Sequence, residues 1–276
     1  MNAFDRMGNG WKLTMAGLTV IRKNKHLLLF PVLSGATLIL VLGSFVLAMF
    51  GADYKQLAAL FDNGNPMRYA ALFVYYLISY FIIVFFNMAL IHTARMYFQG
   101  QQPTVSDGIK FSMSRIGTIF SWALMAATVG LILRAIQEKA GIIGKIITGL
   151  VGIVWSIATF FVVPVLAYEN LRPLDAVKRS AQIMREKWGE SLGSGFSLFV
   201  VNILGLLLIA LPLFFIGSLI STGASIILAV LGVLFVSTVT SAAQTIFISA
   251  AYMKINNEQI EGFEDETIDG LFYQKD

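Results

Sequence analysis

Residues 164–193, PVLAYENLRPLDAVKRSAQIMREKWGESLG, form a charged segment between two long apolar stretches of the chain. Apolar residues recur every three or four positions along its middle part, so a helix would gather them on one face: Val177, Ala181, Met184 and Trp188. Another face of the same helix would carry Lys178, Gln182 and Arg185. A helix of this kind lies flat in a membrane interface, with its basic side toward the lipid head groups. The segment therefore predicts a membrane protein with a basic surface helix between two spans.

The composition of the whole chain supports this interpretation. Of its 276 residues, 57% are hydrophobic and 13% are charged, whereas soluble domains carry about 25% charged residues. A helical span needs roughly 20 apolar residues. Six segments meet that need, the third only at the short limit: 27–50, 69–91, 117–133, 146–168, 196–216 and 225–250. We expect an all-α integral membrane protein with six transmembrane helices, in which Pro164 and Pro212 kink or end the fourth and the fifth.

The distribution of Lys and Arg predicts the orientation in the membrane. The basic stretch before the first span leads directly into a full-length apolar segment, unlike a cleavable signal peptide, so this span is expected to stay as an anchor. If the N-terminus is cytoplasmic, few of the 20 Lys and Arg residues lie outside: Lys55, Arg68, Arg134, Lys139 and Lys145. The positive-inside rule then puts both termini in the cytoplasm. We expect a multi-pass protein of the cytoplasmic (inner) membrane.

A short pattern occurs three times, each time before a pair of spans. The copies are residues 9–14 (NGWKLT), 107–112 (DGIKFS) and 175–180 (DAVKRS). Each starts with Asn or Asp, which are good helix N-caps, and continues with Lys and then Ser or Thr. The sequence thus predicts three hairpins, each preceded by a basic amphipathic interfacial helix. The residues expected to face lipid from these helices are Trp11, Lys12, Lys110, Arg115, Lys178, Arg185 and Trp188.

The repeat sets the expected domain organisation. Residues 1–255 form a single transmembrane domain with repeat-like units 1–98, 99–170 and 171–255. Residues 256–276 are rich in Glu and Asp and form an acidic cytoplasmic tail. The tail is either solvated or docks onto the basic surface helices, and the sequence leaves both options open.

The run 162–193 also resembles a known signature. It is similar to a segment of a broad group of bacterial six-span membrane proteins of unknown function, and to the membrane domain fused to some glycerophosphodiester phosphodiesterases. The residues that carry the resemblance are Pro164, Glu169, Ala176, Arg179, Ser180 and Trp188. The resemblance implies an α-helical membrane domain. It implies no chemistry, because the catalytic domain of those phosphodiesterases is a separate soluble domain.

Ionisable and polar groups in the spans are the candidate functional residues. Glu169 follows an apolar run at the end of the fourth span, where an unpaired carboxylate is costly, so Arg172 or Arg179 is its expected partner. These three residues form either a structural ion pair or a gate at the cytoplasmic mouth of the bundle. A second group either makes interhelical hydrogen bonds or lines a polar path: Asn87, His92, Asn202, Ser237, Ser241 and Gln244.

Several classes of function lack their motifs in this sequence. The chain has no cysteine and only two histidines, which excludes disulfides and a typical zinc site. It contains neither the P-loop pattern nor the H-E-x-x-H metalloprotease pattern. The basic clusters fall on membrane-surface helices, which is a poor match to nucleic-acid binding. We expect no enzymatic activity, no cofactor, no metal and no nucleic-acid partner.

Two functions fit the remaining features. The first is a channel or transporter-like permeation protein that forms a homo-oligomer, and the sequence slightly favours it. The alternative is a non-transporting membrane factor that binds lipids or partner proteins through its basic surface helices. Anionic lipid head groups are expected partners under both hypotheses.

Overall fold

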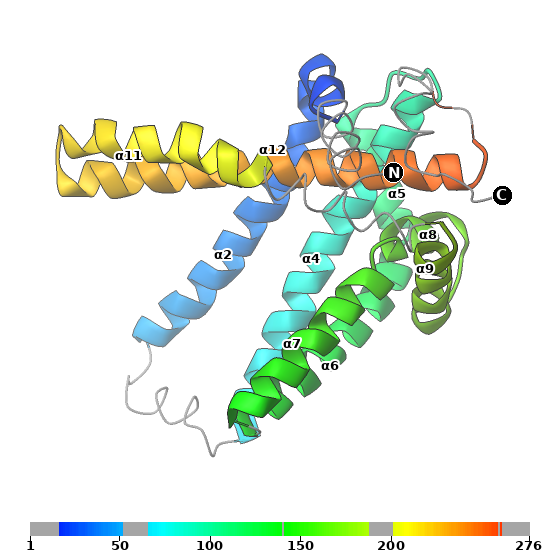
Figure 1. Cartoon of the computed structure of the whole chain (residues 1–276), viewed down its shortest axis with the longest axis horizontal. Helices are drawn as coiled ribbons and strands as arrows, with labels where there is room; N and C mark the ends of the chain where they lie inside the picture. The colour runs from blue at the N-terminus through cyan, green and yellow to red at the C-terminus, as the bar shows by residue number, and fades with distance from the viewer. Residues whose placement is uncertain (1–16, 52–65, 140, 188–200, 259, 261–276) are drawn as a thin grey trace, which may run out of the picture. The chain divides into compact units, whose positions relative to one another are not determined.

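The computed structural model describes residues 17–51, 66–139, 141–187, 201–258 and 260. Within these ranges the chain is helical apart from short turns, and there is no β-strand. In chain order the elements are η1 (Lys25–Leu28), α2 (Leu29–Gly51), α4 (Pro66–Phe98), α5 (Val105–Ser114), α6 (Ile116–Lys139), α7 (Gly141–Ala158), α8 (Val162–Tyr168), α9 (Pro173–Lys187), η2 (Leu206–Ala210), α11 (Leu211–Ser218) and α12 (Thr222–Ile255), as Figure 1 shows. Here η1 is a 3-10 helix and η2 is a short π-helix.

Six stretches of helix are long and apolar enough to cross a membrane. They are Lys25–Ser44, Met67–Phe98, Ile116–Lys139, Gly144–Tyr168, Val201–Ser218 and Thr222–Ile255. The prediction of an all-helical protein with six candidate spans is therefore confirmed. Of the expected lipid-facing residues, Trp11, Lys12 and Trp188 lie outside the described ranges.

The chain divides into two compact units. The first comprises Met1–Pro31, Leu90–Gly108 and Ile183–Asp276, and the second comprises Val32–Ala89 and Ile109–Gln182. Helices α2, α4, α5 and α9 each contribute residues to both units. The three repeat-like units, and the side of the membrane that each terminus faces, stay predictions.

Helices α6 and α7 of the second unit lie side by side (Figure 1). Trp122 of α6 stacks almost parallel on Trp155 of α7, with 6.1 Å between ring centroids and 3° between ring planes. On another face of α6, a Cβ added at Gly130 would lie 3.6–3.8 Å from Tyr76 and Tyr80 of α4. A small residue at this position lets the α6 backbone approach the tyrosine rings closely.

The third span is longer than its apolar stretch. We expected it to cover 117–133, but α6 continues to Lys139. Arg134 and Glu138 lie one turn apart in this extension, and Arg134 Nε lies 2.7 Å from Glu138 Oε1. Oppositely charged residues at this spacing support a helix, which helps α6 to continue past the apolar stretch that ends at residue 133.

The fourth span breaks at the point that Pro164 dictates. Proline has no N–H and its ring clashes with the carbonyl of the residue four positions earlier, here Phe160. The α-helical pattern accordingly stops after Ala158 and resumes at Val162. Such a break leaves backbone N–H groups of the new helix without partners in their own helix.

Pro212 has a comparable effect in the fifth span. The π-helix Leu206–Ala210 precedes it and widens the turn where its missing N–H would have bonded. The span then packs along α12 (Figure 1). A Cβ added at Gly217 would lie 2.5 Å from Ser225 Cα, and one added at Gly232 would lie 2.8 Å from Ala210 Cα. Glycine is required at both positions because the two backbones nearly touch.

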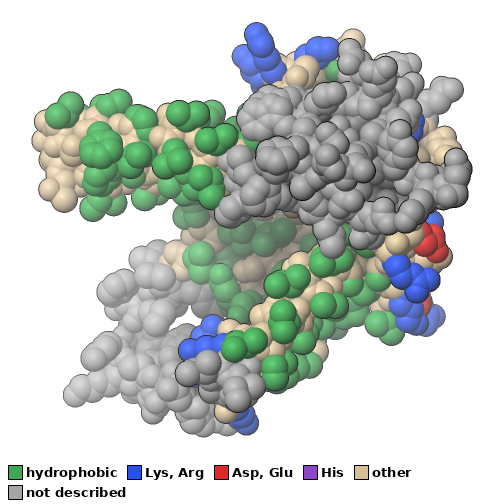
Figure 2. Space-filling view, in the orientation of Figure 1, with side chains coloured by type: hydrophobic (Ala, Val, Ile, Leu, Met, Phe, Trp, Pro, Cys, Tyr) green, Lys and Arg blue, Asp and Glu red, His purple; other side chains and the backbone are tan. Residues whose placement is uncertain are grey.

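Helices α4 and α12 have 33 and 34 residues. At 1.5 Å per residue each is about 50 Å long, whereas the hydrocarbon layer is about 30 Å thick. In α12 the exposed large apolar side chains end at Phe235, and most side chains of 242–253 are buried. Figure 2 shows these exposed hydrophobic side chains over α11 and the adjoining part of α12. The exposed apolar surface of α12 is therefore confined to about its first two fifths, up to Phe235.

The buried end of α12 belongs to the core of the first unit. The Ser249 hydroxyl donates to the Ile91 carbonyl oxygen in the last third of α4, at 3.1 Å. Fully buried Leu27, Phe30 and Phe98 belong to the same unit. The helical segment 17–23 approaches α12 closely at Gly17. A Cβ added at Gly17 would lie 3.3 Å from the backbone oxygen of Ala243.

Candidate functional site

Glu169 and Arg179 form an ion pair at the end of the fourth span. Glu169 is the C-cap residue of α8, and Arg179 lies in the second turn of α9. Arg179 Nε donates to both carboxylate oxygens of Glu169, at 3.1 and 3.2 Å. The side chains are 25% and 33% exposed, so the pair is partly shielded from water. Of the two partners that the sequence offered for Glu169, Arg179 is the one that holds α9 to the span.

Arg172, the other expected partner of Glu169, lies just before the first residue of α9. It is exposed, and its carbonyl oxygen accepts from the Ala176 N–H at 2.9 Å. Pro173 is the first helical residue, where its missing N–H costs nothing. Arg172 therefore marks the beginning of the surface helix.

A second contact at this span end was not visible in the sequence. Asn170 has a positive φ of 50°, a left-handed conformation that Asn tolerates better than most residues. Its Oδ1 accepts from Arg115 Nη1 at 3.0 Å. The rings of Phe111 and Tyr168 pack beside this contact, with centroids 5.7 Å apart. The end of α8 is thus joined to the α5–α6 junction as well as to α9.

Two aligned serines anchor the two described surface helices. Ser112 in α5 is fully buried, and its hydroxyl donates to the Phe85 carbonyl oxygen of α4 at 2.9 Å. Ser180 in α9 is also fully buried, and its Oγ accepts from the Phe161 N–H at 3.0 Å. Phe161 is the donor freed by the break at Pro164. The serines at equivalent positions of the repeated pattern therefore have the same role, since the hydroxyl of each forms a hydrogen bond with the backbone of the preceding span.

The expected N-caps are wrong in position. Helix α5 begins at Val105, and Thr104 and Asp107 bond one another reciprocally: Thr104 N–H donates to Asp107 Oδ2 at 2.8 Å, and Asp107 N–H donates to Thr104 Oγ1 at 3.3 Å. This is a capping box, in which Thr104 caps and Asp107 is the third helical residue. Asp175 is likewise the third residue of α9. Both helices start earlier than the pattern predicted. Asp107 and Asp175 therefore lie in the first turn, where a carboxylate interacts favourably with the positive end of the helix dipole.

Of the described basic side chains expected to face head groups, Lys110 of α5 and Lys178 and Arg185 of α9 are exposed, whereas Arg115 is half-buried. Lys178 has 71% of its side chain exposed and lies 3.5 Å from Asp175, a spacing typical of a weak surface pair. Both surface helices therefore bury a small residue and a serine and direct their lysines outward.

The polar residues within the spans fall into three groups. Asn202 Nδ2 donates to Thr240 Oγ1 at 3.0 Å, which links the fifth span to α12. Asn87 and His92 are half-buried in α4. The third group is exposed and shares one face of α12, at intervals of four and three residues: Ser237, Ser241 and Gln244. This face begins where the exposed apolar side chains of α12 end.

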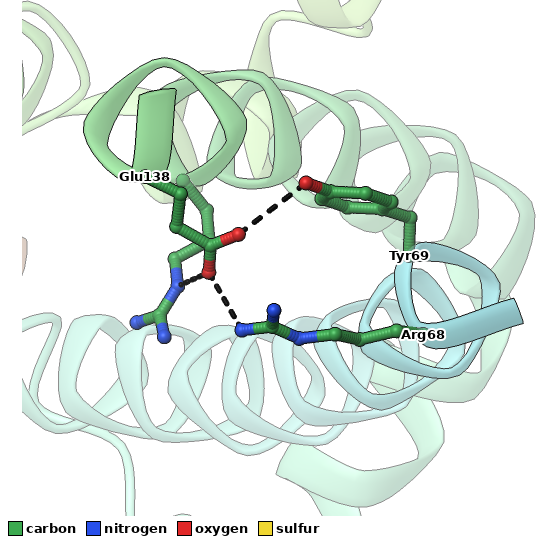
Figure 3. Close-up of polar contacts among 4 residues, drawn as sticks. Arg68, Tyr69 and Glu138 are labelled. Carbon is green, nitrogen blue, oxygen red and sulfur yellow. Dashed lines mark hydrogen bonds and ion pairs between the residues drawn. The ribbon is translucent and has the colours of Figure 1, made fainter. Parts of the chain in front are cut away.

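A further polar cluster joins the beginning of α4 to the end of α6 (Figure 3). The Glu138 carboxylate accepts from Arg68 Nη2 at 2.8 Å, from Arg134 Nε at 2.7 Å and from the Tyr69 hydroxyl at 3.3 Å. The cluster was not predicted from the sequence, although the i,i+4 spacing of Arg134 and Glu138 indicates that these two residues pair. Two arginines share one carboxylate here, so the cluster carries a net positive charge.

In the first unit, Arg95 of α4 pairs with Glu258 beyond the end of α12. Arg95 Nη2 lies 2.8 Å from Glu258 Oε1. Asn257 has a φ of 56°, and Glu258 N–H donates to the Met253 carbonyl oxygen at 2.9 Å. This geometry is a Schellman C-cap, and it turns the chain so that Glu258 returns toward Arg95. Glu258 is the first acid of the predicted tail, and the rest of the tail's acids lie outside the described ranges.

Two further features bear on chemistry. No group of three or more potential metal ligands occurs within the ranges that the structure describes.

Residues 189–193, GESLG, match the letters of the G-x-S-x-G nucleophile elbow but fall in a range that is not described. That elbow follows a β-strand, and the helical segment before residue 188 does not offer this context. The match therefore assigns no catalytic serine.

The chain matches a known protein family. A family model described as "Family of unknown function (DUF6159)" matches residues 66–263, which is more than half of the chain. No curated protein matches the chain. The match agrees with the resemblance to membrane proteins of unknown function, whereas the likeness to the phosphodiesterase membrane domain stays a resemblance.

Proposed function

The chain belongs to the DUF6159 family of unknown function, and on that premise we propose that it is a membrane factor that binds anionic lipid through its surface helices. This function needs neither a transport path nor a catalytic step. It is the alternative that the sequence left open, and the geometry of α5 and α9 favours it over permeation.

One observation carries the proposal. Ser112 and Ser180 fix α5 and α9 to the backbone of the preceding spans, and each helix exposes a lysine five residues past its first residue. A basic side chain near an anionic membrane surface gains about 1 kcal/mol from that surface. Because the helices are already fixed, they hold Lys110 and Lys178 at the interface with little further loss of conformational entropy.

A lipid-enrichment experiment tests this function. The protein is extracted into nanodiscs from vesicles that contain phosphatidylcholine and phosphatidylglycerol, and the bound lipid is quantified by mass spectrometry. Replacement of three exposed basic residues (Lys110→Gln, Lys178→Gln and Arg185→Gln) should lower phosphatidylglycerol enrichment by about fivefold or more. The matched control replaces Lys139 and Lys145, which belong to the opposite span ends. Equal enrichment in both variants contradicts the proposal.

The proposal includes an orientation and a location. Lys110, Lys178 and Arg185 would lie at the cytoplasmic leaflet, with both termini in the cytoplasm and the six spans in the cytoplasmic (inner) membrane. The excess of Lys and Arg at these span ends supports this orientation. Accessibility of single cysteines introduced at Lys110 and at Lys145 to a membrane-impermeant reagent in spheroplasts tests it, since only the second should react.

Permeation by a homo-oligomer is the second candidate function. It rests on Ser237, Ser241 and Gln244, which are exposed along one face of α12. Polar side chains on a span favour another helix or water over lipid. Ion or solute flux into liposomes that contain the purified protein tests this candidate. A flux that Gln244→Leu abolishes supports it, and flux equal to that of empty liposomes rules it out.

A further inference from the structure

Arg115 differs from the other half-buried arginines of the described chain in having no carboxylate partner. Arg68 pairs with Glu138, Arg95 with Glu258 and Arg179 with Glu169. Arg115 is also half-buried, but its partners among the described residues are an amide oxygen and an aromatic ring. A partly desolvated cation without a counter-ion is costly. This difference calls for an anion from outside the described chain.

The surroundings of Arg115 hold its guanidinium in place and leave most of its donors available. Asn170 Oδ1 accepts from Nη1 at 3.0 Å, and the guanidinium carbon lies 5.9 Å from the centroid of the Phe111 ring. Phe111 is itself packed against Tyr168. A guanidinium has five N–H donors, and its planar fork matches two oxygens of a phosphate.

The position of Arg115 identifies the source of the anion. Arg115 is the residue between α5 and α6, and the third candidate span begins at the next residue, Ile116. A residue that directly precedes a span is expected near the level of the lipid phosphates, where its guanidinium can reach one. Apolar side chains on both sides of Arg115 are exposed along the chain: Met113, Ile116 and Phe120. Exposed apolar surface beside a fixed cation suits an amphiphile with a phosphate and acyl chains.

We propose that Arg115, positioned by Asn170 and Phe111, binds the phosphate of one membrane phospholipid at the junction of α5 and α6. The inference deepens the proposed lipid-binding function and rests on it. It differs in being a discrete site with one ligand, whereas Lys110, Lys178 and Arg185 attract anionic lipid as separate exposed charges. Asn170 acts as a positioning residue, since its amide orients the guanidinium and leaves the outer N–H groups for the phosphate.

Native mass spectrometry tests the site. The purified protein in detergent is titrated with phosphatidylglycerol, and the dissociation constant of the first bound lipid is measured. We expect Arg115→Gln to weaken the first binding step about tenfold, the loss typical of a charge-assisted hydrogen bond. Arg172→Gln is the control, because it removes the same charge from an exposed residue nearby. Equal affinity in Arg115→Gln and the control overturns the proposal.

Asn170→Ala keeps the charge and provides a second test if Arg115→Gln does not fold. It should weaken the first lipid several-fold, and an unchanged affinity overturns the positioning role. A further titration adds inorganic phosphate alone. Displacement of the lipid by millimolar phosphate would show that the site takes a soluble anion and would contradict the lipid assignment.

The two proposals can fail separately. If the site is wrong and the surface-helix function is right, the Lys110, Lys178 and Arg185 variant loses enrichment while Arg115→Gln binds its first lipid normally. If the surface-helix function is wrong and the site is right, the reverse pattern appears.

Discussion

Ser112 and Ser180 occupy the same position in two copies of a repeated pattern, and both bond the backbone of the span that precedes their helix. The Ser112 hydroxyl donates to a carbonyl oxygen and the Ser180 hydroxyl accepts from an N–H. The serine therefore has the same place in both copies of the pattern, but the direction of its hydrogen bond differs. A serine hydroxyl can do both. This explains how one residue type anchors a surface helix both to an intact span and to one broken by Pro164.

The first prediction concerns Ser180. In Ser180→Ala the buried Phe161 N–H loses its acceptor, and an unsatisfied buried donor costs about 1–3 kcal/mol. The thermal midpoint of the detergent-purified protein should fall. Ser114→Ala is the matched control, since the Ser114 hydroxyl bonds the Phe111 carbonyl oxygen within its own exposed turn. Equal midpoints for the two variants would mean that the Ser180 bond does not stabilise the protein.

The second prediction concerns the coupling of Glu169 and Arg179. A double-mutant cycle with Glu169→Gln and Arg179→Gln should give a coupling free energy of about 1 kcal/mol, near the upper end for partly exposed pairs. The same cycle on Asp175 and Lys178 serves as the reference, because that pair is more exposed and longer. Its coupling should be close to zero. A larger coupling in the exposed pair would argue against a stabilising role of the Glu169–Arg179 pair.

The third prediction concerns the close approach of α11 and α12. In Gly217→Ala the added Cβ would lie 2.5 Å from Ser225 Cα, so the two helices must move apart. Overpacking of this kind costs about 1–3 kcal/mol. Gly35→Ala is the control, since nothing lies within 4 Å of its added Cβ. Unfolding in detergent should start at a lower temperature in Gly217→Ala only, and an unchanged midpoint would show that the hairpin is loosely packed.

The sequence predicted features that depend on local chemistry. The spans follow from apolar length, and the break near the end of the fourth follows from Pro164. The pairing of Glu169 with Arg179 was one of two options because both Arg172 and Arg179 follow the carboxylate closely in the sequence. Choosing between them required the start of α9, which places Arg179 on the face toward Glu169 and leaves Arg172 before the helix.

Contacts between distant segments could not be predicted in this way. Arg115 and Asn170 are 55 residues apart, and Arg68 and Glu138 are 70 apart. No periodicity relates such residues, because their contact depends on how the helices pack. The positive φ of Asn170 is also invisible in the sequence, although it directs the side chain that accepts from Arg115.

The last prediction concerns the cluster that ties α4 to α6. In Glu138→Gln the Arg68 and Arg134 guanidinium groups lose their shared carboxylate and repel each other, so the thermal midpoint should fall. Lys139→Gln is the control, because it removes a charge from the next residue without touching the cluster. Salt separates the two contributions, since it screens the repulsion between exposed charges and leaves packing almost unchanged. The destabilisation by Glu138→Gln should therefore shrink between low salt and 1 M salt. If the destabilisation is the same at both salt concentrations, its cause is helix packing and not charge repulsion. If it is no larger than that of Lys139→Gln, the cluster does not stabilise the contact between α4 and α6.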